Sequence, residues 1–592
     1  MMSALKQTSN VEILNVAQRP SFIPHADYLI KNDGVYVEQG NAKGTSMVKI
    51  TYKPVYPTAL MRNKNGNGGW SIRVSYINLD GQECVCDIEY ADMHNDRGSI
   101  ASTLVEQGFP LVMGKVKDVF KFLADHVEEL ERITTVEHLG WVDDQMAFLL
   151  PDGVISDQAL ENNYAYLPKD KNSGEVFVKK GSLASWQEHV LLPVASLNFA
   201  LFTMLIAFTS CLLKLLKLES GGFNLWGASS KGKTASLQAY ASVWGSGGTT
   251  GSGEKDVFIK SWNATARGLE TLPPSRSGTG MALDELGLAD DRSFASSVYT
   301  IADGAGSLVM DQNRNAIQPT QWTIMFVSSS EMSMREKIKT GGKVFKPGMA
   351  VRLIDVPLDG FEDVEDDDIS ITITPKARVE QIKKGASLHY GHAGPMFIQK
   401  LTEQFVSVEE AYDVLTAKHQ EIADSYYIDD MSSEHYRIAD RFALVALAGK
   451  LAVDYGILTL EQDQVDDAII DAINAWYDSD DTVDENARVI EHIGAYITKN
   501  LLRFRAVDDD DLEANQDNIG FKKDNLYLLS KEQLVKACDG ISINIAKKAL
   551  MENGLLHTHG SDKDKRYTCR YHVEGFGRLT FYALKDSIVA SE

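Results

Sequence analysis

The sequence predicts an α/β protein whose centre is a mostly parallel sheet with crossover helices, flanked by further folded regions. Three observations support this prediction. Short apolar segments alternate with helical segments between about residues 181 and 357. A glycine-rich loop suited to phosphate follows one of these apolar segments. The 592 residues are 44% hydrophobic and 24% charged, which is typical of several folded domains rather than of a disordered or fibrous chain.

Composition also limits the compartment and the partners. The five cysteines are scattered without a CxxC pair, so neither a disulfide framework nor a zinc site is expected. The first residues lack the features of a secretion signal, which predicts a cytoplasmic protein. The formal net charge of −24 argues against a chain that coats nucleic acid or anionic membrane over its whole surface. This net charge is still compatible with a local basic site.

The first 180 residues are expected to form a mixed α/β region. Segments Val48–Tyr52, Trp70–Leu79 and Cys84–Tyr90 alternate or cluster β-branched and aromatic residues between turns, which predicts strands. Helical periodicity follows in Ser102–Gln107 and Val116–Leu130.

One segment is long enough to span a bilayer. Val190–Leu213 contains no charged residue over 24 positions. Polar residues such as Asn198 and Thr203 interrupt it, and it leads directly into the phosphate loop, which must lie in water. We therefore expect a buried helix and no membrane partner; a membrane-anchored ATPase is the alternative.

The phosphate loop is the most informative segment. A short apolar strand, Phe223–Trp226, delivers the chain to it, and a helix, Ala235–Trp244, follows. In a GxxxxGK[ST] loop, backbone N–H groups bind the β-phosphate, the lysine reaches the β and γ oxygens, and the hydroxyl residue holds Mg²⁺. The predicted ligands are ATP and Mg²⁺, and the predicted binding residues are Gly227, Ala228, Ser229, Ser230, Lys231, Gly232, Lys233, Thr234, Ala235 and Asp284.

Three later strands supply candidates for the chemistry. Met281–Glu285 ends in two carboxylates, of which Asp284 can coordinate Mg²⁺ through water and Glu285 can polarise the attacking water. Gln321–Val327 leads into Ser329, at a strand end where ring ATPases sense the γ-phosphate. Val351–Val356 begins beside Arg352, which suits a finger inserted into a neighbouring subunit's site. An ordinary surface salt bridge is the alternative for Arg352.

The remaining chain is expected to contain a helical block and a small terminal domain. Met396–Phe405, Val408–Lys418 and Ile438–Tyr455 have helical periodicity. Residues 461–520 hold 17 acidic against 4 basic residues, whereas residues 541–592 hold 6 against 8. The change in charge predicts a boundary before the terminal segment. The expected regions are a mixed α/β region over residues 1–180, a P-loop ATPase core over 181–360, a helical lid over 361–465, an acidic helical linker over 466–523 and a winged-helix domain over 524–592.

The terminal segment has the order of a winged helix. Helices over Ser530–Cys538 and Ser542–Met551 precede strands over Leu555–His559 and Arg566–His572. Such domains bind DNA or protein, and both partners are open here. The candidate contacts to DNA phosphates are Lys547, Lys548, Lys565 and Arg566.

Several motifs together resemble domain-of-unknown-function family 927, which includes putative replicative helicases of mobile elements, among them those of staphylococcal cassette chromosomes. The resemblance covers about residues 135 to 460. It depends on Gly181–Trp186, Gly221–Gly227, Ala241–Gly245, Trp262–Glu270, Leu283–Gly287 and Tyr390–Pro395.

The resemblance implies an AAA+ ATPase similar to the minichromosome-maintenance helicases, which assemble as hexameric rings around DNA. By that analogy Lys233, Thr234, Asp284 and Glu285 are the Walker residues, and Ser329 is sensor 1. Arg352 corresponds to the arginine finger. Arg441 corresponds to sensor 2, with Arg437 as the alternative.

In these rings a β-hairpin before sensor 1 projects into the pore. Gly304–Met310 and Ile317–Trp322 fit its two arms, with Arg314 near the tip. Ser307-Leu308-Val309 stand where the family usually has basic residues. The predicted function is an ATP-dependent DNA helicase that acts on single-stranded or forked DNA during replication of a mobile element, with a loader or primase as a further partner. The alternative is a nucleotide-controlled oligomeric switch or defence protein without strand separation.

Overall fold

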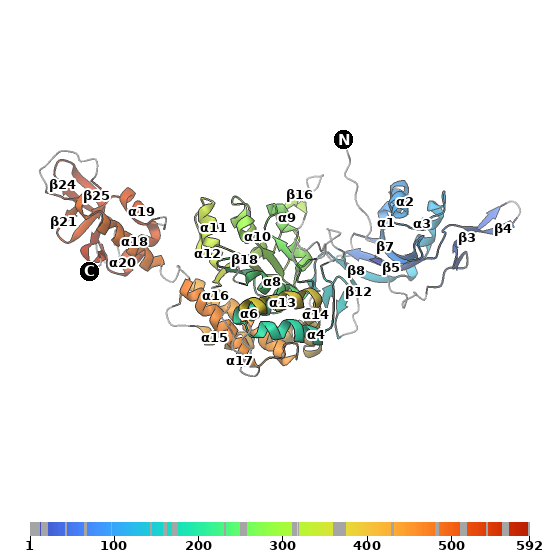
Figure 1. Ribbon diagram of the computed structural model, residues 1–592. Helices are drawn as coiled ribbons and strands as arrows, with labels where there is room; N and C mark the ends of the chain where they lie inside the picture. Colours follow the sequence, from blue (N-terminus) through green and yellow to red (C-terminus); the bar gives the residue numbers. More distant parts are fainter. Residues whose placement is uncertain are drawn as a thin grey trace. The chain divides into compact units, whose positions relative to one another are not determined.

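The structure is a computed structural model that describes residues 12–13, 22–41, 44–63, 68–95, 97–142, 145–157, 163–167, 176–229, 232–248, 257–310, 316–317, 319–358, 374–427, 431–479, 485–508, 518–539, 541, 543–558 and 567–589. The chain divides into two compact units (Figure 1). The first comprises Met1–Gly341 and Gly348–Ile473, and the second comprises Gly342–Pro347 and Asn474–Glu592.

The first unit begins with a six-stranded sheet in the order β1-β7-β6-β5-β8-β12. Buried residues such as Ile72, Val74 and Phe122 join this sheet to three helices in one apolar core. Two three-stranded sheets, β2-β3-β4 and β11-β10-β9, complete the region. The strands are β1 (Glu12–Ile13), β2 (Tyr28–Lys31), β3 (Gly34–Asn41), β4 (Gly44–Lys49), β5 (Val55–Asn63), β6 (Ser71–Ile77), β7 (Glu83–Glu89), β8 (Glu131–Val136), β9 (Gly140–Trp141), β10 (Phe148–Leu150), β11 (Gly153–Ile155) and β12 (Asn163–Tyr166), and the helices are α1 (Tyr90–Asn95), α2 (Arg97–Glu106) and α3 (Val116–Asp125).

The predicted parallel sheet follows. Its five strands lie in the order β14-β15-β18-β13-β19, and every pairing between them is parallel. The carboxyl ends of all five strands therefore share one edge of the sheet, where α/β proteins bind ligands. The strands are β13 (Gly221–Trp226), β14 (Ile259–Ser261), β15 (Met281–Asp284), β18 (Met325–Ser330) and β19 (Leu353–Pro357), and the helices between them include α8 (Lys233–Ser242), α9 (Ala266–Glu270), α10 (Phe294–Asp303), α11 (Met334–Thr340) and α12 (Pro347–Ala350).

The long uncharged segment is not a single helix. It is divided among a π-helical turn (Gln187–Leu191), α5 (Leu192–Ala195), α6 (Asn198–Ile206) and α7 (Ser210–Leu215), and preceded by α4 (Leu183–Trp186). Its apolar side chains are buried, among them Leu201, Phe202 and Leu205 at 0% exposure. Among the described residues, none of the helices has the length and apolarity to cross a membrane.

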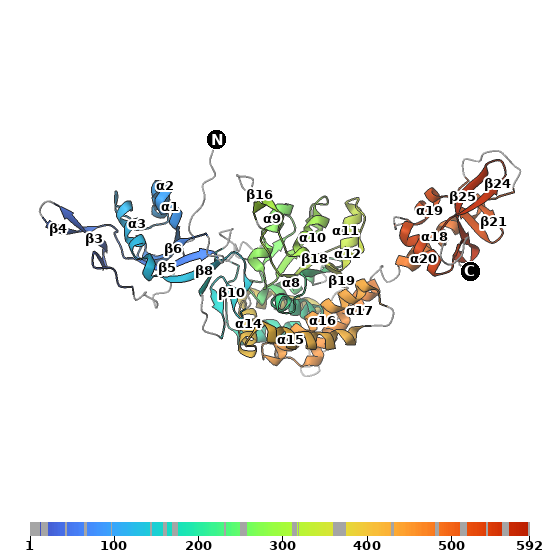
Figure 2. The same ribbon diagram turned by 180° about the vertical axis from the view of Figure 1, so that it is seen from behind.

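Five helices follow the sheet: α13 (Pro375–Leu388), α14 (Ala393–Gln404), α15 (Val408–Tyr426), α16 (Ser433–Asp454) and α17 (Gln462–Ser479). Figure 2 shows α14 to α17 gathered on one side of the first unit. Ser407 and Ser432 begin two of them, because their side chains accept from the backbone N–H groups of Glu410 and His435.

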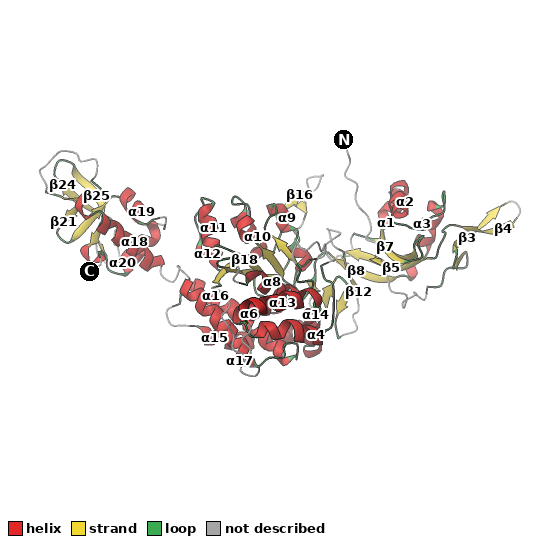
Figure 3. Cartoon of the chain, viewed as in Figure 1, coloured by secondary structure: helices red, strands yellow, loops and turns green. Residues whose placement is uncertain are grey.

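The second unit is a helix-and-sheet domain (Figure 3). Its sheet has the order β20-β21-β22-β25-β23, and β24 pairs with β25. The longest strand, β25 (Gly577–Lys585), was not predicted, although it pairs with β22, β23 and β24. The other elements are α18 (Glu485–Lys499), β20 (Phe504–Ala506), β21 (Gly520–Lys523), β22 (Leu526–Leu529), α19 (Lys531–Ala537), α20 (Ile543–Glu552), β23 (Leu556–His557) and β24 (Cys569–Val573).

The structure differs from the expected acidic linker over residues 466–523. Val489, Ile493 and Ile497 of α18 are fully buried in one core with Leu534 of α19 and Leu550 of α20. Residues 485–508 and 518–523 are therefore part of the terminal domain. The sequence suggested a linker because acidic residues are dense on both sides of α18, whereas α18 itself has two acidic and two basic residues and an apolar stripe that faces the domain.

Candidate functional site

The phosphate loop lies at the carboxyl edge of the parallel sheet, between β13 and α8. Gly227 and Gly232 have φ values of 153° and 94°, which favour glycine. A Cβ on Gly227 would also lie 2.4 Å from the carbonyl oxygen of Leu358. Lys233 Nζ donates to the carbonyl oxygens of Gly227 and Ala228 at 2.6 and 2.8 Å, so the lysine lies over its own loop. The predicted residues Ser230 and Lys231 lie outside the described part of the chain.

The next two strands bring polar groups to the same edge. The hydroxyl of Ser329, on β18, donates to the carboxylate of Asp284 at the end of β15. The backbone N–H of Glu285 also donates to this carboxylate, at 3.1 Å. Glu285 itself is exposed and has a φ of 60°, an uncommon conformation for a residue with a Cβ. The strand therefore ends abruptly at Asp284, and Glu285 follows in a tight turn.

A buried polar row supports this edge from within the sheet. Asn224 of β13 donates from Nδ2 to Asp355 Oδ1 at 2.7 Å, and the N–H of Met334 donates to Asp355 Oδ2 at 2.9 Å. Burial raises the pKa of Asp355 to about 6. On the other side of Asn224, Ser328 accepts from Trp262 Nε1 at 2.9 Å. Asp355 therefore links α11 to β13, the strand that carries the phosphate loop, and Trp262 links the end of β14 to the neighbouring strand β18.

One acidic residue at this edge was missed by the sequence reasoning. Glu331, two residues beyond Ser329, accepts a hydrogen bond from the hydroxyl of Ser229 in the phosphate loop. Burial lowers the pKa of Lys233, while the charges of Glu331 and Asp284 oppose that effect. Glu331 is thus close to the loop lysine. The signal available in the sequence was its position just after a strand end that already carried Ser329.

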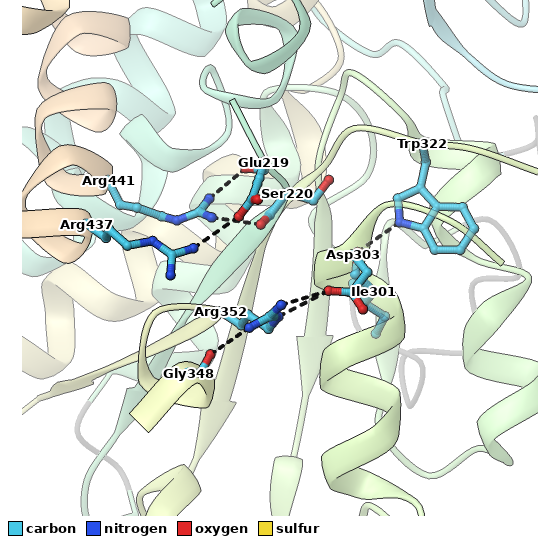
Figure 4. Close-up of polar contacts among 9 residues, drawn as sticks. All are labelled: Glu219, Ser220, Ile301, Asp303, Trp322, Gly348, Arg352, Arg437 and Arg441. Carbon is cyan, nitrogen blue, oxygen red and sulfur yellow. Dashed lines mark hydrogen bonds and ion pairs between the residues drawn. The ribbon is translucent and has the colours of Figure 1, made fainter. Parts of the chain in front are cut away.

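The predicted arginines lie at the opposite edge of the sheet (Figure 4). Arg441 is buried and donates to the carbonyl oxygens of Glu219 and Ser220 at 2.9 and 2.8 Å, just before β13 begins. Burial lowers its pKa to about 10. Arg437 donates to the Glu219 carboxylate at 3.1 Å.

Arg352 immediately precedes β19 at this same amino edge. Its guanidinium forms an ion pair with Asp303 at 3.0 Å, donates to the carbonyl oxygen of Gly348 at 3.0 Å, and lies 4.7 Å from the ring centroid of Tyr299. Asp303 and Glu219 also border a cavity of about 550 Å³. A strand of six residues spans roughly 20 Å. Arg352 and Arg441 are therefore about one strand length from the phosphate loop of their own chain.

The predicted hairpin arms are present. β16 (Val309–Met310) and β17 (Ala316–Ile317) pair antiparallel, and Ala305 bridges Gln321 below them. Glu270, at the end of α9, accepts hydrogen bonds from both the N–H and the hydroxyl of Ser307. The hairpin base is therefore attached to α9, a contact that the sequence did not reveal. Arg314 lies outside the described residues.

The described arm carries an apolar surface. Leu308 and Met310 are 67% and 65% exposed. Arg267, one helical turn before Glu270 on α9, is also exposed. Since residues three apart share one face of a helix, Arg267 lies on the side of α9 that holds the hairpin. Arg267 of α9 therefore places a basic side chain beside the hairpin.

In the second unit, α20 carries two of the predicted DNA contacts. Lys547 Nζ lies 5.8 and 5.7 Å from the ring centroids of Tyr567 and Tyr582, and Lys548 is exposed. On the paired strands β24 and β25, Arg570 and Arg578 are exposed as well. The predicted contacts Lys565 and Arg566 fall outside the part that the structure describes.

Five of the predicted residues thus meet at one edge: Lys233, Thr234, Asp284, Glu285 and Ser329. Together they offer backbone N–H groups at a helix N-terminus, one lysine, two hydroxyls and two carboxylates. This set of donors fits a nucleotide phosphate with a divalent cation, Thr234 and Asp284 being the oxygen ligands available to Mg²⁺.

Comparisons with known proteins agree with the resemblance. Residues 28–317 match the family model described as Domain of unknown function (DUF927), which confirms the expected family. The match begins earlier and ends earlier than the expected range of 135 to 460, so it includes the N-terminal sheets. No curated protein matches the sequence significantly.

The fold itself is similar to that of a solved helicase. The structure described as "SCCmec type IV Cch - active helicase" aligns with a TM-score of 0.69 and 17% identity, covering 95% of this chain and 98% of that chain. At this identity the similarity concerns the fold alone. A second structure, "The A form apo structure of NrS-1 C terminal region-CTR", covers 89% of this chain and 96% of that chain at 9% identity, but its TM-score of 0.32 is too low for an argument.

Proposed function

From the premise that residues 28–317 form a domain of family DUF927, we propose that this chain is an ATP-dependent DNA helicase that works as a ring, in the replication of a mobile element. The observation that carries the proposal is the contact between Ser329 and Asp284 beside the phosphate loop. It joins the predicted sensor to the predicted metal ligand. The fold similarity to an active helicase supports the same function.

The proposed reaction is hydrolysis of the terminal phosphate of ATP. The loop N–H groups and Lys233 bind the phosphates, while Thr234 and Asp284 hold Mg²⁺, which offsets phosphate charge. Glu285 polarises the attacking water as a general base. Ser329, which contacts Asp284, would report the presence of the γ-phosphate to β18.

Arg352 is proposed to act on a neighbouring subunit. It lies at the amino edge of the sheet, roughly one strand length from the phosphate loop of its own chain. Arg441 lies at the same edge but is buried against the carbonyl oxygens of Glu219 and Ser220, so the exposed Arg437 is the more accessible candidate for sensor 2. In a closed ring, one edge of each subunit faces the other edge of the next. An arginine at the amino edge could then complete the ATP site next door, as arginine fingers do. This arrangement favours a homo-oligomer, proposed here as a hexamer.

DNA is proposed to contact two parts of the chain. The hairpin, attached to α9 through Glu270, would follow single-stranded DNA with Arg314 and Arg267, while Leu308 and Met310 offer apolar contact to bases. In the winged-helix assignment of the second unit, Lys547 and Lys548 of α20, together with Lys565 and Arg566, would neutralise phosphates of duplex DNA. A loader or primase would deliver the ring to its template.

Strand displacement on a forked DNA tests the proposal. Wild-type protein with ATP and Mg²⁺ should release the displaced strand, whereas Lys233→Ala should not. Electron microscopy of the same mixture should reveal rings threaded by DNA. ATP hydrolysis without strand displacement, on forks of either polarity, would favour the alternative of an oligomeric switch or defence protein.

A further inference from the structure

Glu331 adds a third carboxylate, after Asp284 and Glu285, to the edge of the sheet that carries the phosphate loop. It follows β18 at the carboxyl edge of the sheet, and its carboxylate accepts a hydrogen bond from Ser229, the third residue of the phosphate loop. Glu331 is exposed, so no apolar packing explains its position. Its one described hydrogen bond joins it to the loop.

The charge of Glu331 also acts on the lysine that would bind the terminal phosphates. It is the larger of the two favourable charge effects on the pKa of Lys233, ahead of that of Asp284. A carboxylate this close to Lys233 competes with phosphate for the same cation.

We propose that Glu331 sets the nucleotide preference of this site, by weakening binding of a nucleoside triphosphate relative to the diphosphate. The inference rests on the proposed nucleotide function. The γ-phosphate is the group that Lys233 reaches beyond the β-phosphate, and it adds about one negative charge. That added charge is repelled by Glu331, whereas the diphosphate leaves the contact between Ser229 and Glu331 in place.

The consequence is a site that retains the diphosphate unless another cation offsets Glu331. Mg²⁺ supplies part of that compensation, as it does wherever phosphates are bound. A guanidinium from an adjacent subunit would supply more. Glu331 would therefore make ATP binding depend on assembly more strongly than ADP binding does.

The test compares two nucleotides in four forms of the full-length protein. Isothermal titration calorimetry with ADP and with the slowly hydrolysed analogue ATPγS, both with Mg²⁺, gives a ratio of dissociation constants for each form. Glu331→Gln removes the charge but keeps the size and an acceptor for Ser229. Glu331→Asp keeps the charge, and Glu421→Gln removes an exposed carboxylate on α15 as a control.

Glu331→Gln should bind ATPγS about tenfold more tightly, because about 1.4 kcal/mol of repulsion corresponds to a factor of ten. Its affinity for ADP should change less than about twofold. Glu331→Asp and Glu421→Gln should keep the wild-type ratio of the two dissociation constants. An unchanged ratio in Glu331→Gln, or an equal gain for both nucleotides, overturns the inference while leaving the proposed function intact. Loss of ADP binding in that variant would make Glu331 a structural anchor of the loop, which also overturns it. If wild-type protein binds neither nucleotide, the proposed function itself fails.

Discussion

The guanidinium of Arg352 forms an ion pair with the carboxylate of Asp303 at 3.0 Å, at the amino edge of the parallel sheet. The Arg352 side chain is 26% exposed and that of Asp303 is 54% exposed, so the pair is accessible from outside. In a single subunit this arginine has a partner from its own chain. To reach a phosphate in a neighbouring site, it must exchange Asp303 for that phosphate.

A mixing experiment tests whether Arg352 acts in trans. Arg352→Ala should bind ATP but hydrolyse it at least about tenfold more slowly, because one positive charge is missing from the adjacent site. Mixing this variant with Lys233→Ala protein should restore part of the ATPase activity, since some interfaces then join an intact arginine to an intact loop. An absence of rescue at every mixing ratio would contradict the trans arrangement.

Glu285→Gln should separate binding from hydrolysis. The phosphate loop, Asp284 and Ser329 stay unchanged, so ATP affinity should change little. The water loses its general base, and turnover should fall by about 10² or more. Nucleotide binding and phosphate release, measured on the same preparation, check the expected affinity and the expected loss of turnover. Near-normal turnover would show that Glu285 is not the general base.

Glu270→Ala should release the base of the hairpin from α9. Both contacts of Ser307 to this side chain are lost, so the base of the hairpin loses its two hydrogen bonds to α9. Basal ATPase activity should persist, whereas DNA-stimulated ATPase activity and strand displacement should fall several-fold. Arg314→Ala should have the same effect without loosening the base. Unchanged DNA stimulation in both variants would remove the hairpin from the DNA path.

Two truncations test the boundary of the terminal domain. Ending the chain after Ser479 removes the whole second domain with its core, so the remaining protein should stay monodisperse and keep basal ATPase activity. Ending it after Asp524 leaves α18 with Val489, Ile493 and Ile497 uncovered, and that protein should aggregate. Size-exclusion chromatography distinguishes the two truncated proteins.

The chain that ends after Ser479 should also bind duplex DNA with a flatter salt dependence, because fewer phosphates are neutralised. An unchanged salt slope would indicate that the terminal domain binds protein.

Asp355 should make stability depend on pH. Its folded pKa of about 6 lies above the ordinary value of 3.8, so the folded state binds more protons between those values. Stability should therefore decrease as pH rises from about 4 through 6, and the loss should be complete about one pH unit above the folded pKa. Asp355→Asn does not ionise, so relative to wild type it should gain about 1 kcal/mol between pH 5 and 7.5. Thermal unfolding of both proteins at the two pH values measures this difference. If both proteins lose the same stability between these pH values, Asp355 is not the source of the pH dependence.

Features that are encoded in short contiguous segments could be predicted from the amino-acid sequence alone. The loop from Gly227 to Thr234, the strand ending in Asp284 and Glu285, and the arms of the hairpin were all predictable, because glycine positions and apolar periodicity act locally. The strand order, by contrast, depends on pairings between distant segments. Parallel pairing brought Asp284 and Ser329 together at the edge that also carries Lys233.

Contacts between residues that are far apart in the sequence became apparent only from the folded chain. Ser229 and Glu331 are 102 residues apart, and Arg441 and Glu219 are 222 residues apart. The position of Glu331 after a strand end is the one local signal that separates it from an ordinary surface carboxylate, and no local pattern reveals that Arg441 lies at the edge opposite the phosphate loop. The sequence also did not show that the apolar residues of β25 and α18 pack into one shared core. The sequence specifies the chemistry of each side chain directly. The residues that surround each side chain, however, depend on the strand pairing and packing of the whole domain.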